Sequence, residues 1–402
     1  MSLNNPTPPT KLDLGKSLRG TFSKCWPPGS MRGRAPPGVA PGYFTIRMTG
    51  LYRETSAAQD TRTRYEEAVH HMQQIRTECE KDKVKSGEWM AKRTQDDLMA
   101  AVVGSNRIEE VGGTERITLR ICREIFAGRT FAAEEINERD ADYAAELEYQ
   151  AKLGRDKNQP SVIRGRYEII QHAKATKLLV DSIVGRNEPL TEGLIKEAHH
   201  ILAQHTDEAE NAGKYRTCSE GARWGRREET DEEYQARVQE IKKYKPDRVP
   251  ERRKDKPIFE TTFVPPKSVP ILMGRLVEQY NLDMAAADRT GELDVMTLAA
   301  KYCYYFVSIH PFEDGNGRLC RLLLNVILLK YVGVCIDVAS TPKENYEWIS
   351  MTNAANKAFK KEVDDVEWDQ HTGHATIGTM VIRKAHEKLA KLWESIPSRK
   401  QG

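Results

Sequence analysis

The chain has 402 residues, which is enough for one large or two modest domains with a well-buried core. Its 62 Lys and Arg against 59 Asp and Glu give a formal net charge of +3, which excludes a strongly basic protein that coats duplex nucleic acid. Hydrophobic residues make up 39% of the chain and charged residues 30%, as in a soluble, helix-rich protein. Asn325 and Lys330 interrupt the longest apolar stretch, so no membrane span is expected.

The cysteines and the N-terminus indicate a reducing compartment. Seven cysteines are odd in number, widely scattered and without a CxxC pair, which argues against a disulfide framework or a thiolate zinc site. The N-terminus lacks the apolar segment of a signal peptide. We therefore expect a cytoplasmic protein, with the nucleus as the alternative.

Helical patterns follow a Pro- and Gly-rich beginning. Residues 1–55 predict a disordered tail, because they contain too little apolar surface to offset the entropy of ordering. From about residue 57, apolar side chains recur every three or four positions, so 56–113 are expected to form N-terminal helices. The helical ranges predicted by this spacing are 88–103, 129–152, 165–184, 191–204, 267–281, 293–308, 317–331, 343–359 and 376–394.

One segment interrupts the helical pattern, between residues 213 and 266. Its ends, 215–218 and 258–263, carry β-branched and aromatic residues that suit two short strands. Between them, residues 221–257 are dense in charges of both signs, and 233–244 is their strongest helical stretch. We interpret this part as a solvated insertion.

The most informative stretch, residues 308–321, joins two apolar helices through a tight loop. Gly315 and Gly317 let the backbone turn closely, and the loop leads directly into a helix N-terminus. The free N–H groups and positive dipole end of such a terminus favour an anion. Arg318 and Arg321 stand three residues apart, so their guanidinium groups project to one side and suit a polyphosphate.

Two further residues of this stretch supply chemistry. Asp314 can hold a divalent cation that bridges phosphate oxygens. His310, whose free pKa is near neutrality, can take a proton from an attacking hydroxyl. The combination predicts a nucleotide-dependent group-transfer site.

The string His-Pro-Phe-x-Asp-Gly-Asn-Gly-Arg-x-x-Arg, complete from His310 to Arg321, resembles the signature of Fic-domain proteins of the Fido superfamily. The resemblance implies an all-α Fic fold, a helical bundle with a small β-hairpin flap. It places a Fic core at 114–360 and a C-terminal helical extension at 361–402. It also implies an enzyme, a protein adenylyltransferase that transfers AMP from ATP to a Ser, Thr or Tyr hydroxyl of a protein, which is called AMPylation.

The same resemblance assigns roles to the matched residues. His310 would be the general base, and Asp314 would bind Mg²⁺, with Mn²⁺ as an alternative. The nucleotide would be held by Gly315, Asn316, Gly317, Arg318 and Arg321. In this set Asn316 would contact phosphate, and the two arginines would clamp the β- and γ-phosphates. The family also has a tyrosine and an asparagine near the adenine, which would be Tyr346 and Asn353 here.

Two weaker matches flank the charged insertion. Residues 213–216, Gly-Lys-Tyr-Arg, resemble the family's G-x-Y-R step into the flap, and 263–266 resemble its exit. A target protein would dock its hydroxyl-bearing segment on this flap by adding an edge strand. His199 and His200, on the preceding helix, are interpreted as structural residues.

A regulatory motif is the second distinctive resemblance. Ser105 to Glu109 resembles the inhibitory [S/T]-x-x-x-E of Fic proteins that carry an N-terminal brake, although the next position, usually Gly or Asn, is Glu110. If Glu109 pairs with Arg321, that arginine cannot clamp the γ-phosphate and transfer is suppressed. We therefore expect autoinhibition.

Other functions remain open at this stage. The same fold could remove AMP from a modified protein, with Glu109 as the base that positions water. It could also transfer a phosphate or a different nucleotide, or serve as a non-catalytic nucleotide-binding interaction module. No nucleic-acid or membrane partner is expected, and a homodimer is the oligomeric state that the resemblance suggests.

Overall fold

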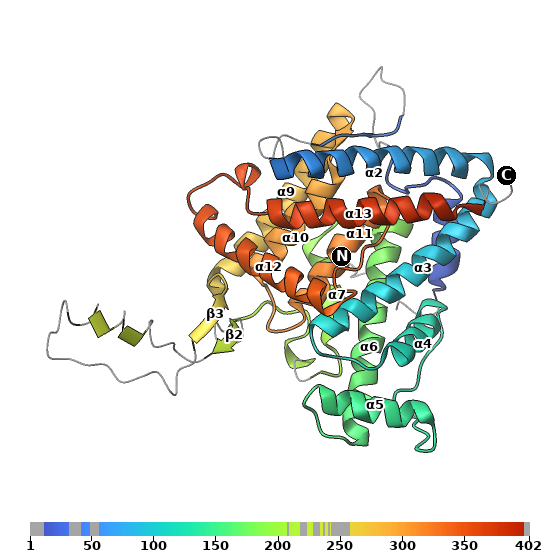
Figure 1. The fold of residues 1–402 in the computed structure, drawn as a ribbon. Coiled ribbons are helices and arrows are strands. Elements are labelled where there is room, and N and C mark those ends of the chain that lie inside the picture. Colours follow the sequence, from blue (N-terminus) through green and yellow to red (C-terminus); the bar gives the residue numbers. More distant parts are fainter. Residues whose placement is uncertain are drawn as a thin grey trace, which may run out of the picture.

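A computed structural model describes residues 12–31, 42–48, 56–206, 209–217, 223–227, 234–235, 238–239, 242 and 258–397. The described chain is a bundle of helices with two small two-stranded sheets (Figure 1). The expectation of an all-α fold is therefore confirmed. None of the described helices combines the length and the hydrophobicity that crossing a bilayer requires.

The helices before the interruption are α1 (Leu14–Phe22), α2 (Ser56–Lys81), α3 (Lys83–Ile108), α4 (Glu115–Phe126), α5 (Ala141–Lys152), α6 (Gln159–Leu179) with its π-helical continuation η2 (Val180–Gly185), and α7 (Glu192–Ala203). Those after it are α9 (Val269–Thr290), α10 (Val295–Ile309), α11 (Asn316–Tyr331), α12 (Pro342–Glu362) and α13 (Ala375–Ser395). Short 3₁₀ turns are η3 (Ala209–Asn211), η4 (Pro266–Ser268) and η5 (Trp368–Gln370).

The strands form two separate pairs. β1 (Thr45–Ile46) lies parallel to β4 (Glu292–Leu293), and β2 (Arg223–Arg227) lies antiparallel to β3 (Ile258–Thr262). In Figure 1 the β2–β3 pair stands at one side of the helical body. The predicted strand at 215–218 is wrong, because residues 215–217 form no strand and the first strand of the hairpin begins at Arg223. Most of 221–257 lies outside the described residues, and within it the described residues 234–235, 238–239 and 242 are helical.

The core is centred on α10 and α11. Nearly every residue of both helices is buried, including the charged Arg318 and Arg321 of α11. α10 packs against α9, α11, α12 and α13, and α13 in turn lies beside α2 (Figure 1). The loop that joins α10 to α11 is thus anchored at both ends in the best-packed part of the molecule.

The N-terminal region corrects the predicted tail. Within 1–55, residues 12–31 and 42–48 are ordered, and α1 packs on α3 through Leu14, Leu18 and Phe22, each at most 3% exposed. The four-residue spacing of these side chains gives α1 one apolar face, and the carboxylate of Asp13 caps its first turn. Residues 1–11, 32–41 and 49–55 lie outside the described residues.

Besides α1, one further helix was not predicted, and one was predicted too long. The predicted range 129–152 is helical only from Ala141, because Asp140 is an extended N-cap whose side chain accepts the N–H of Asp142. α4 went unpredicted, although Thr114 caps it and its apolar face is fully buried. The remaining predicted ranges agree with α3, α6, α7, α9, α10, α11, α12 and α13 to within a few residues at most ends.

Substituting alanine at two helical glycines tests this packing, because the free energy of unfolding should change in opposite directions. A Cβ on Gly87 of α3 would lie 2.9 Å from the backbone nitrogen of Ser23, whereas one on Gly274 of α9 would meet nothing within 4 Å. Gly87→Ala should therefore lower the free energy of unfolding by about 1–3 kcal/mol. Gly274→Ala should raise it by about 1 kcal/mol because alanine is the better helix former. Urea unfolding followed by circular dichroism measures both, and equal effects would contradict the contact between α3 and the α1 segment.

Candidate active site

The loop between α10 and α11 is built from its own sequence. α10 ends at His310, which adopts the left-handed conformation (φ 52°), and Gly315 (φ 76°) turns the chain into α11. The side-chain amide of Asn316 accepts the N–H of Phe312 at 2.9 Å and donates to its carbonyl at 2.8 Å. Phe312 is fully buried, so the loop is pinned in the core at its midpoint. The side chain of Asn316 is therefore occupied within the loop, which leaves its backbone N–H at the start of α11 for an anion, and contact of Asn316 with phosphate stays a prediction.

Arg216 fixes the end of α10. Its backbone N–H donates to Pro311 at 2.9 Å, and its guanidinium donates to the carbonyls of His310 at 2.7 Å, Ile309 at 3.2 Å and Val264 at 2.5 Å. Arg216 is 3% exposed. Arg216, from the Gly-Lys-Tyr-Arg motif, lies near one end of the segment 213–266, and Val264 lies near the other. Arg216 thus joins both ends of this segment to the loop after α10.

His199 supports the same loop from α7, as the structural interpretation expects. Its ring stacks on Phe312 with centroids 3.7 Å apart. Nδ1 accepts the N–H of Gly213 at 3.0 Å, so Nε2 carries the hydrogen that it donates to the carbonyl of Asp314 at 2.9 Å. Burial lowers the pKa of His199 to about 4, which keeps the ring neutral and this pattern intact. His200 instead bonds the carbonyl of Ala212 and the side chain of Gln204.

The start of α11 is arranged for an anion. No side chain caps it, so the N–H groups of its first turn have no partner of that kind. Arg318 is only 3% exposed and uses Nη2 to donate to Asp314 at 2.8 Å. Its Nε and Nη1 are buried and have no hydrogen-bond partner among the described residues. A buried guanidinium with unused donors beside a helix N-terminus suits a phosphate or a carboxylate.

Asp314 presents its carboxylate at the rim of this anion site. Its side chain is 57% exposed. Burial of part of the group opposes ionisation, but the charge of Arg318 and the N–H of Gly315 hold the pKa of Asp314 below its usual value. The carboxylate is therefore ionised at neutral pH and able to take a hard cation.

His310 lies against Phe263, the first residue of the segment 263–266 that follows the flap. The ring of Phe263 stacks on its imidazole with centroids 3.7 Å apart and planes 13° apart. Burial lowers the pKa of His310 to about 3, and the positive charge of Arg216 adds to the effect. The imidazole is neutral at physiological pH and can accept a proton, provided that a substrate reaches it past Phe263.

Arg321 is held by α3, as the resemblance to the inhibitory motif predicts. Its Nη2 donates to Glu109 Oε1 at 2.5 Å, and its Nε donates to the hydroxyl of Ser105 at 2.8 Å. The Arg321 side chain is 4% exposed. Glu109 also covers the first turn of α11, because a Cβ on Gly317 would overlap its carboxylate. Ser105 and Glu109 thus occupy the guanidinium that was expected to clamp phosphate.

The last turn of α3 is fixed by a Schellman motif. The N–H of Val111 donates to Asn106 at 3.1 Å, that of Glu110 donates to Arg107 at 3.3 Å, and Glu110 adopts φ 53°. This conformation explains why Gly or Asn usually follows the motif glutamate. Glu110 departs from that preference and carries the steric cost of a left-handed side-chain-bearing residue.

Buried polar residues that the sequence analysis did not single out hold the segment after α3. Glu168 of α6 accepts the N–H of Gly112 at 2.7 Å and pairs with Arg155 at 2.8 Å, and Gln150 donates to the carbonyl of Gly112 at 2.7 Å. His172 bonds Asn106 at 2.6 Å. The sequence shows these residues only as polar positions within the apolar pattern of α6, and from this pattern their bonding partners cannot be predicted.

Two predicted nucleotide residues lie elsewhere than in the loop. Tyr346 is 77% exposed on α12. Asn353 of the same helix accepts the hydroxyl of Thr261 on β3 at 2.8 Å, and Lys360 donates to Thr262 at 2.6 Å. Asn353 therefore ties the flap hairpin to α12, and contact of either residue with adenine stays a prediction.

The strained position at the end of α3 gives a testable prediction. Glu110→Gly should raise the free energy of unfolding by about 1 kcal/mol, because glycine adopts φ 53° without steric cost. The same substitution at Glu115, in the first turn of α4, should lower it by a similar amount. Thermal and urea unfolding of both variants checks this, and a loss of stability in Glu110→Gly would refute the strain.

Buried neutral histidines predict acid sensitivity. Burial lowers the pKa of four described histidines: His172, His199, His310 and His374. Below pH 6.5 the unfolded chain binds protons that the folded chain does not, so stability should fall as the pH falls from 7.5 to 5.5. The loss should be about 1 kcal/mol per histidine. Urea unfolding at both pH values measures it. His199→Gln should reduce the pH dependence, with His70→Gln at an exposed site as control.

A comparison of the amino-acid sequence with known protein families finds a match that covers the loop between α10 and α11. The model of the Fic/DOC family matches residues 189–328, which include α7, α10, the loop and most of α11. All the residues of the anion site lie in this range, whereas Ser105 and Glu109 lie before it.

Individual proteins show the same relationship. A Fido domain-containing protein of Dictyostelium discoideum is 34% identical over 102 residues, which are 25% of this chain and 67% of that protein. A probable protein adenylyltransferase of Aquifex aeolicus is 34% identical over 95 residues, which are 24% of this chain and 28% of that protein. The match thus spans less than a third of the length of this adenylyltransferase.

A solved structure extends the likeness beyond the matched segment. A fragment of Fic-1 from C. elegans superimposes with a TM-score of 0.50 at 16% identity, over 84% of this chain and 73% of that chain. At this identity the likeness concerns the fold, and it confirms the expected Fic fold. With the complete signature at the junction of α10 and α11, these matches show that the chain belongs to the Fic/DOC family.

Proposed function

We propose that this protein is an autoinhibited protein adenylyltransferase, which transfers AMP from ATP to a hydroxyl of another protein. The observation that carries the proposal is the loop between α10 and α11, where a neutral imidazole, an ionised carboxylate and a buried guanidinium with unused donors meet at an uncapped helix N-terminus. The relative in Aquifex aeolicus that is named a probable protein adenylyltransferase supports the choice of transferred group.

The residues present fit a magnesium-bound nucleotide. The unused Nε and Nη1 of Arg318 and the first N–H groups of α11 would hold phosphate oxygens. Asp314 would be the protein ligand of Mg²⁺, with its remaining ligands supplied by phosphate and water. When bound, the cation would neutralise phosphate charge and make the α-phosphate more open to attack.

His310 would remove the proton of the attacking hydroxyl. Its neutral imidazole can accept this proton, and the hydroxyl oxygen would then bond the α-phosphorus while the bond from that phosphorus to the β-phosphate oxygen breaks and pyrophosphate leaves. Phe263 covers the ring, so the target chain has to displace it or slide beside it. The β2–β3 pair, tied to α12 through Asn353, would offer the target an edge strand next to that opening.

Autoinhibition would follow from the contacts of Arg321. With Glu109 and Ser105 bonded to it, this guanidinium cannot also clamp a γ-phosphate. ATP would then bind in a pose unsuited to in-line attack on the α-phosphate. The Schellman motif and the bonds of Gly112 to Glu168 and Gln150 would keep Glu109 in place.

Transfer of label from α-³²P-ATP with Mg²⁺ tests the function. Glu109→Gly should raise transfer to itself and to added proteins about tenfold or more, because loss of a charge-assisted bond releases Arg321. Glu110→Gly is the matched control, since it removes a neighbouring carboxylate that makes no contact with Arg321 in the described structure, and its transfer should stay low. Adding His310→Ala to Glu109→Gly should abolish the label.

Other outcomes would select the alternatives. If Glu109→Gly binds ATP but transfers nothing, the adenylyltransferase proposal is wrong and a binding module takes its place. If wild type instead strips AMP from labelled protein in a Glu109-dependent reaction, the same site performs removal.

A further inference from the structure

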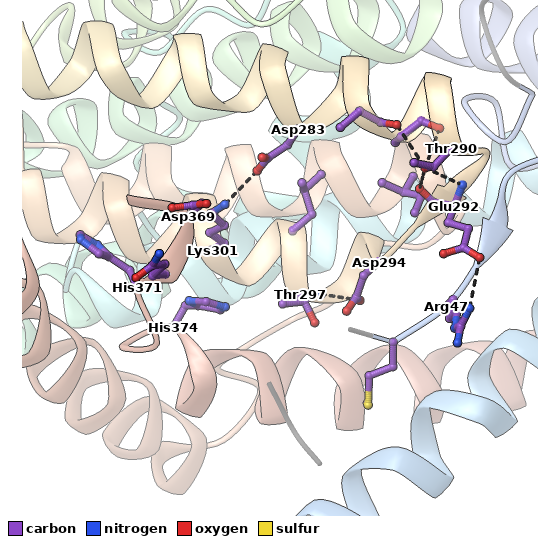
Figure 2. A pocket seen from close by; sticks show the side chains of 16 residues that line it. Arg47, Asp283, Thr290, Glu292, Asp294, Thr297, Lys301, Asp369, His371 and His374 are labelled. Carbon is purple, nitrogen blue, oxygen red and sulfur yellow. Dashed lines mark hydrogen bonds and ion pairs between the residues drawn. The ribbon is translucent and has the colours of Figure 1, made fainter. Parts of the chain in front are cut away.

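In many parts of the described structure, opposite charges lie beside each other. The cavity in Figure 2 is an example, because Lys301 pairs with Asp283 at 2.9 Å and Arg47 pairs with Glu292 at 3.2 Å in its walls. The chain as a whole is also nearly balanced, with a formal net charge of +3. A surface on which one sign of charge has no partner therefore calls for an explanation.

The outer face of α12 is such a surface. Counted in steps of three or four residues, one side of this helix presents four exposed lysines, Lys343, Lys357, Lys360 and Lys361. Within the described part of the chain, none of the four forms an ion pair with a carboxylate. Their positive charges are therefore open to a partner from outside the chain.

The acidic residues of α12 do not neutralise this face. Glu344 and Glu347 pair with basic side chains of α13, and Glu362 accepts backbone N–H groups of the loop that follows the helix. The next acids, at positions 364 and 365, come after the end of α12. Each sign of charge thus occupies its own side of the helix.

An aromatic side chain lies on the same face. Tyr346 follows Lys343 by three residues and is 77% exposed, which is the highest exposure of any large hydrophobic side chain in the described chain. Tyrosine is enriched at the centres of protein interfaces. The ring therefore favours a protein as the partner of this face.

The face continues into the flap hairpin. Asn353 and Lys360 are bonded to the hydroxyls of Thr261 and Thr262 at 2.8 and 2.6 Å, so β3 lies against the second half of α12 (Figure 1). The next residue, Phe263, covers the imidazole of the proposed base. A target segment that reaches this opening would therefore place its neighbouring residues over α12.

We propose that the outer face of α12 docks an acidic segment of the target protein, next to the hydroxyl that receives AMP. The lysines contact carboxylates of that segment, and the ring of Tyr346 packs against its apolar atoms. The inference rests on the proposed transfer of AMP to a protein and adds the class of protein that is selected. Exposed charge pairs contribute little affinity one by one, so selection depends on several lysines acting together.

Fluorescence anisotropy with labelled peptides tests this surface without a transfer step. The probe is a peptide with a serine between valines and glutamates on both sides, and matched peptides carry glutamines or lysines instead. At low salt the full chain should bind the glutamate peptide about tenfold more tightly than the glutamine peptide, and the lysine peptide least tightly. High salt should remove the difference.

Two double variants locate the effect. Lys357→Glu with Lys361→Glu should abolish the preference for the glutamate peptide. Lys92→Glu with Lys391→Glu, at exposed lysines of α3 and α13, changes the net charge equally and should retain the preference.

Transfer kinetics connect the surface to the reaction. In the Glu109→Gly background, Lys357→Glu with Lys361→Glu should raise KM for the glutamate peptide about tenfold but not KM for ATP. If the glutamate peptide binds through these lysines but receives no label, the docking surface stands and the proposed function fails.

Four results would overturn the docking surface. The first is equal binding of the glutamate and glutamine peptides, and the second is an equal loss of affinity in both double variants, which would mean that only net charge acts. The third is a rise in KM for ATP instead of the peptide, which would assign the lysines to the nucleotide. The fourth is tighter binding of oligo-dT than of the glutamate peptide at the same lysines, which would replace the protein by a nucleic acid.

Discussion

The corner between α10 and α11 is the constraint on which the site depends. α10 is buried on all sides and ends in a histidine with a left-handed backbone, a conformation that costs a side-chain-bearing residue about 1–2 kcal/mol. Arg216 offsets this cost by bonding the carbonyls of Ile309 and His310 that the helix end leaves open. The same turn places the imidazole against Phe263 and leads into α11, whose first N–H groups have no side-chain cap. The positions of the proposed base and of the proposed anion site thus both follow from one backbone bend.

The second constraint is the contact of the last turn of α3 with α11. Its final turn brings Ser105 and Glu109 onto Arg321, and the segment beyond is bonded to α5 and α6 through Gly112. The proposed brake is therefore part of the folded core. Its release would require α3 to shift against α6 and the α1 segment, or the single pair of Glu109 with Arg321 to open. The second change is smaller, since the Glu109 side chain is already 29% exposed.

The sequence alone predicted much of this arrangement. Apolar spacing located most helices, because amphipathic and fully apolar segments of this length allow few alternatives. The residues of the loop were predictable because Gly315, Asn316 and Arg318 are neighbours in the chain and their roles depend on local geometry. The ion pair of Arg321 with Glu109 was predicted only through a family resemblance, because the two residues are 212 positions apart in the chain.

What the sequence did not predict involves partners that are distant in the chain. The sequence does not predict α1, because its apolar face is short and is stabilised by docking on the distant elements α3 and η2. The bonds of Glu168 to Gly112 and of Arg216 to Ile309 join residues 56 and 93 positions apart. The bonds by which the Asn316 side chain folds the loop were also not predicted, although its amide satisfies both backbone groups of Phe312.

The neutral ring of His199 has a mechanical consequence. One of its nitrogens is bonded to Gly213, where the chain leaves α7 toward the flap, and the other is bonded to the backbone of Asp314. Its face rests on Phe312, so the ring cannot tilt without disturbing the loop. The ring therefore joins the start of the flap segment to the backbone of Asp314, whose carboxylate lies at the rim of the anion site. A displacement of Gly213 would therefore act on the backbone of Asp314 through a ring that stays neutral.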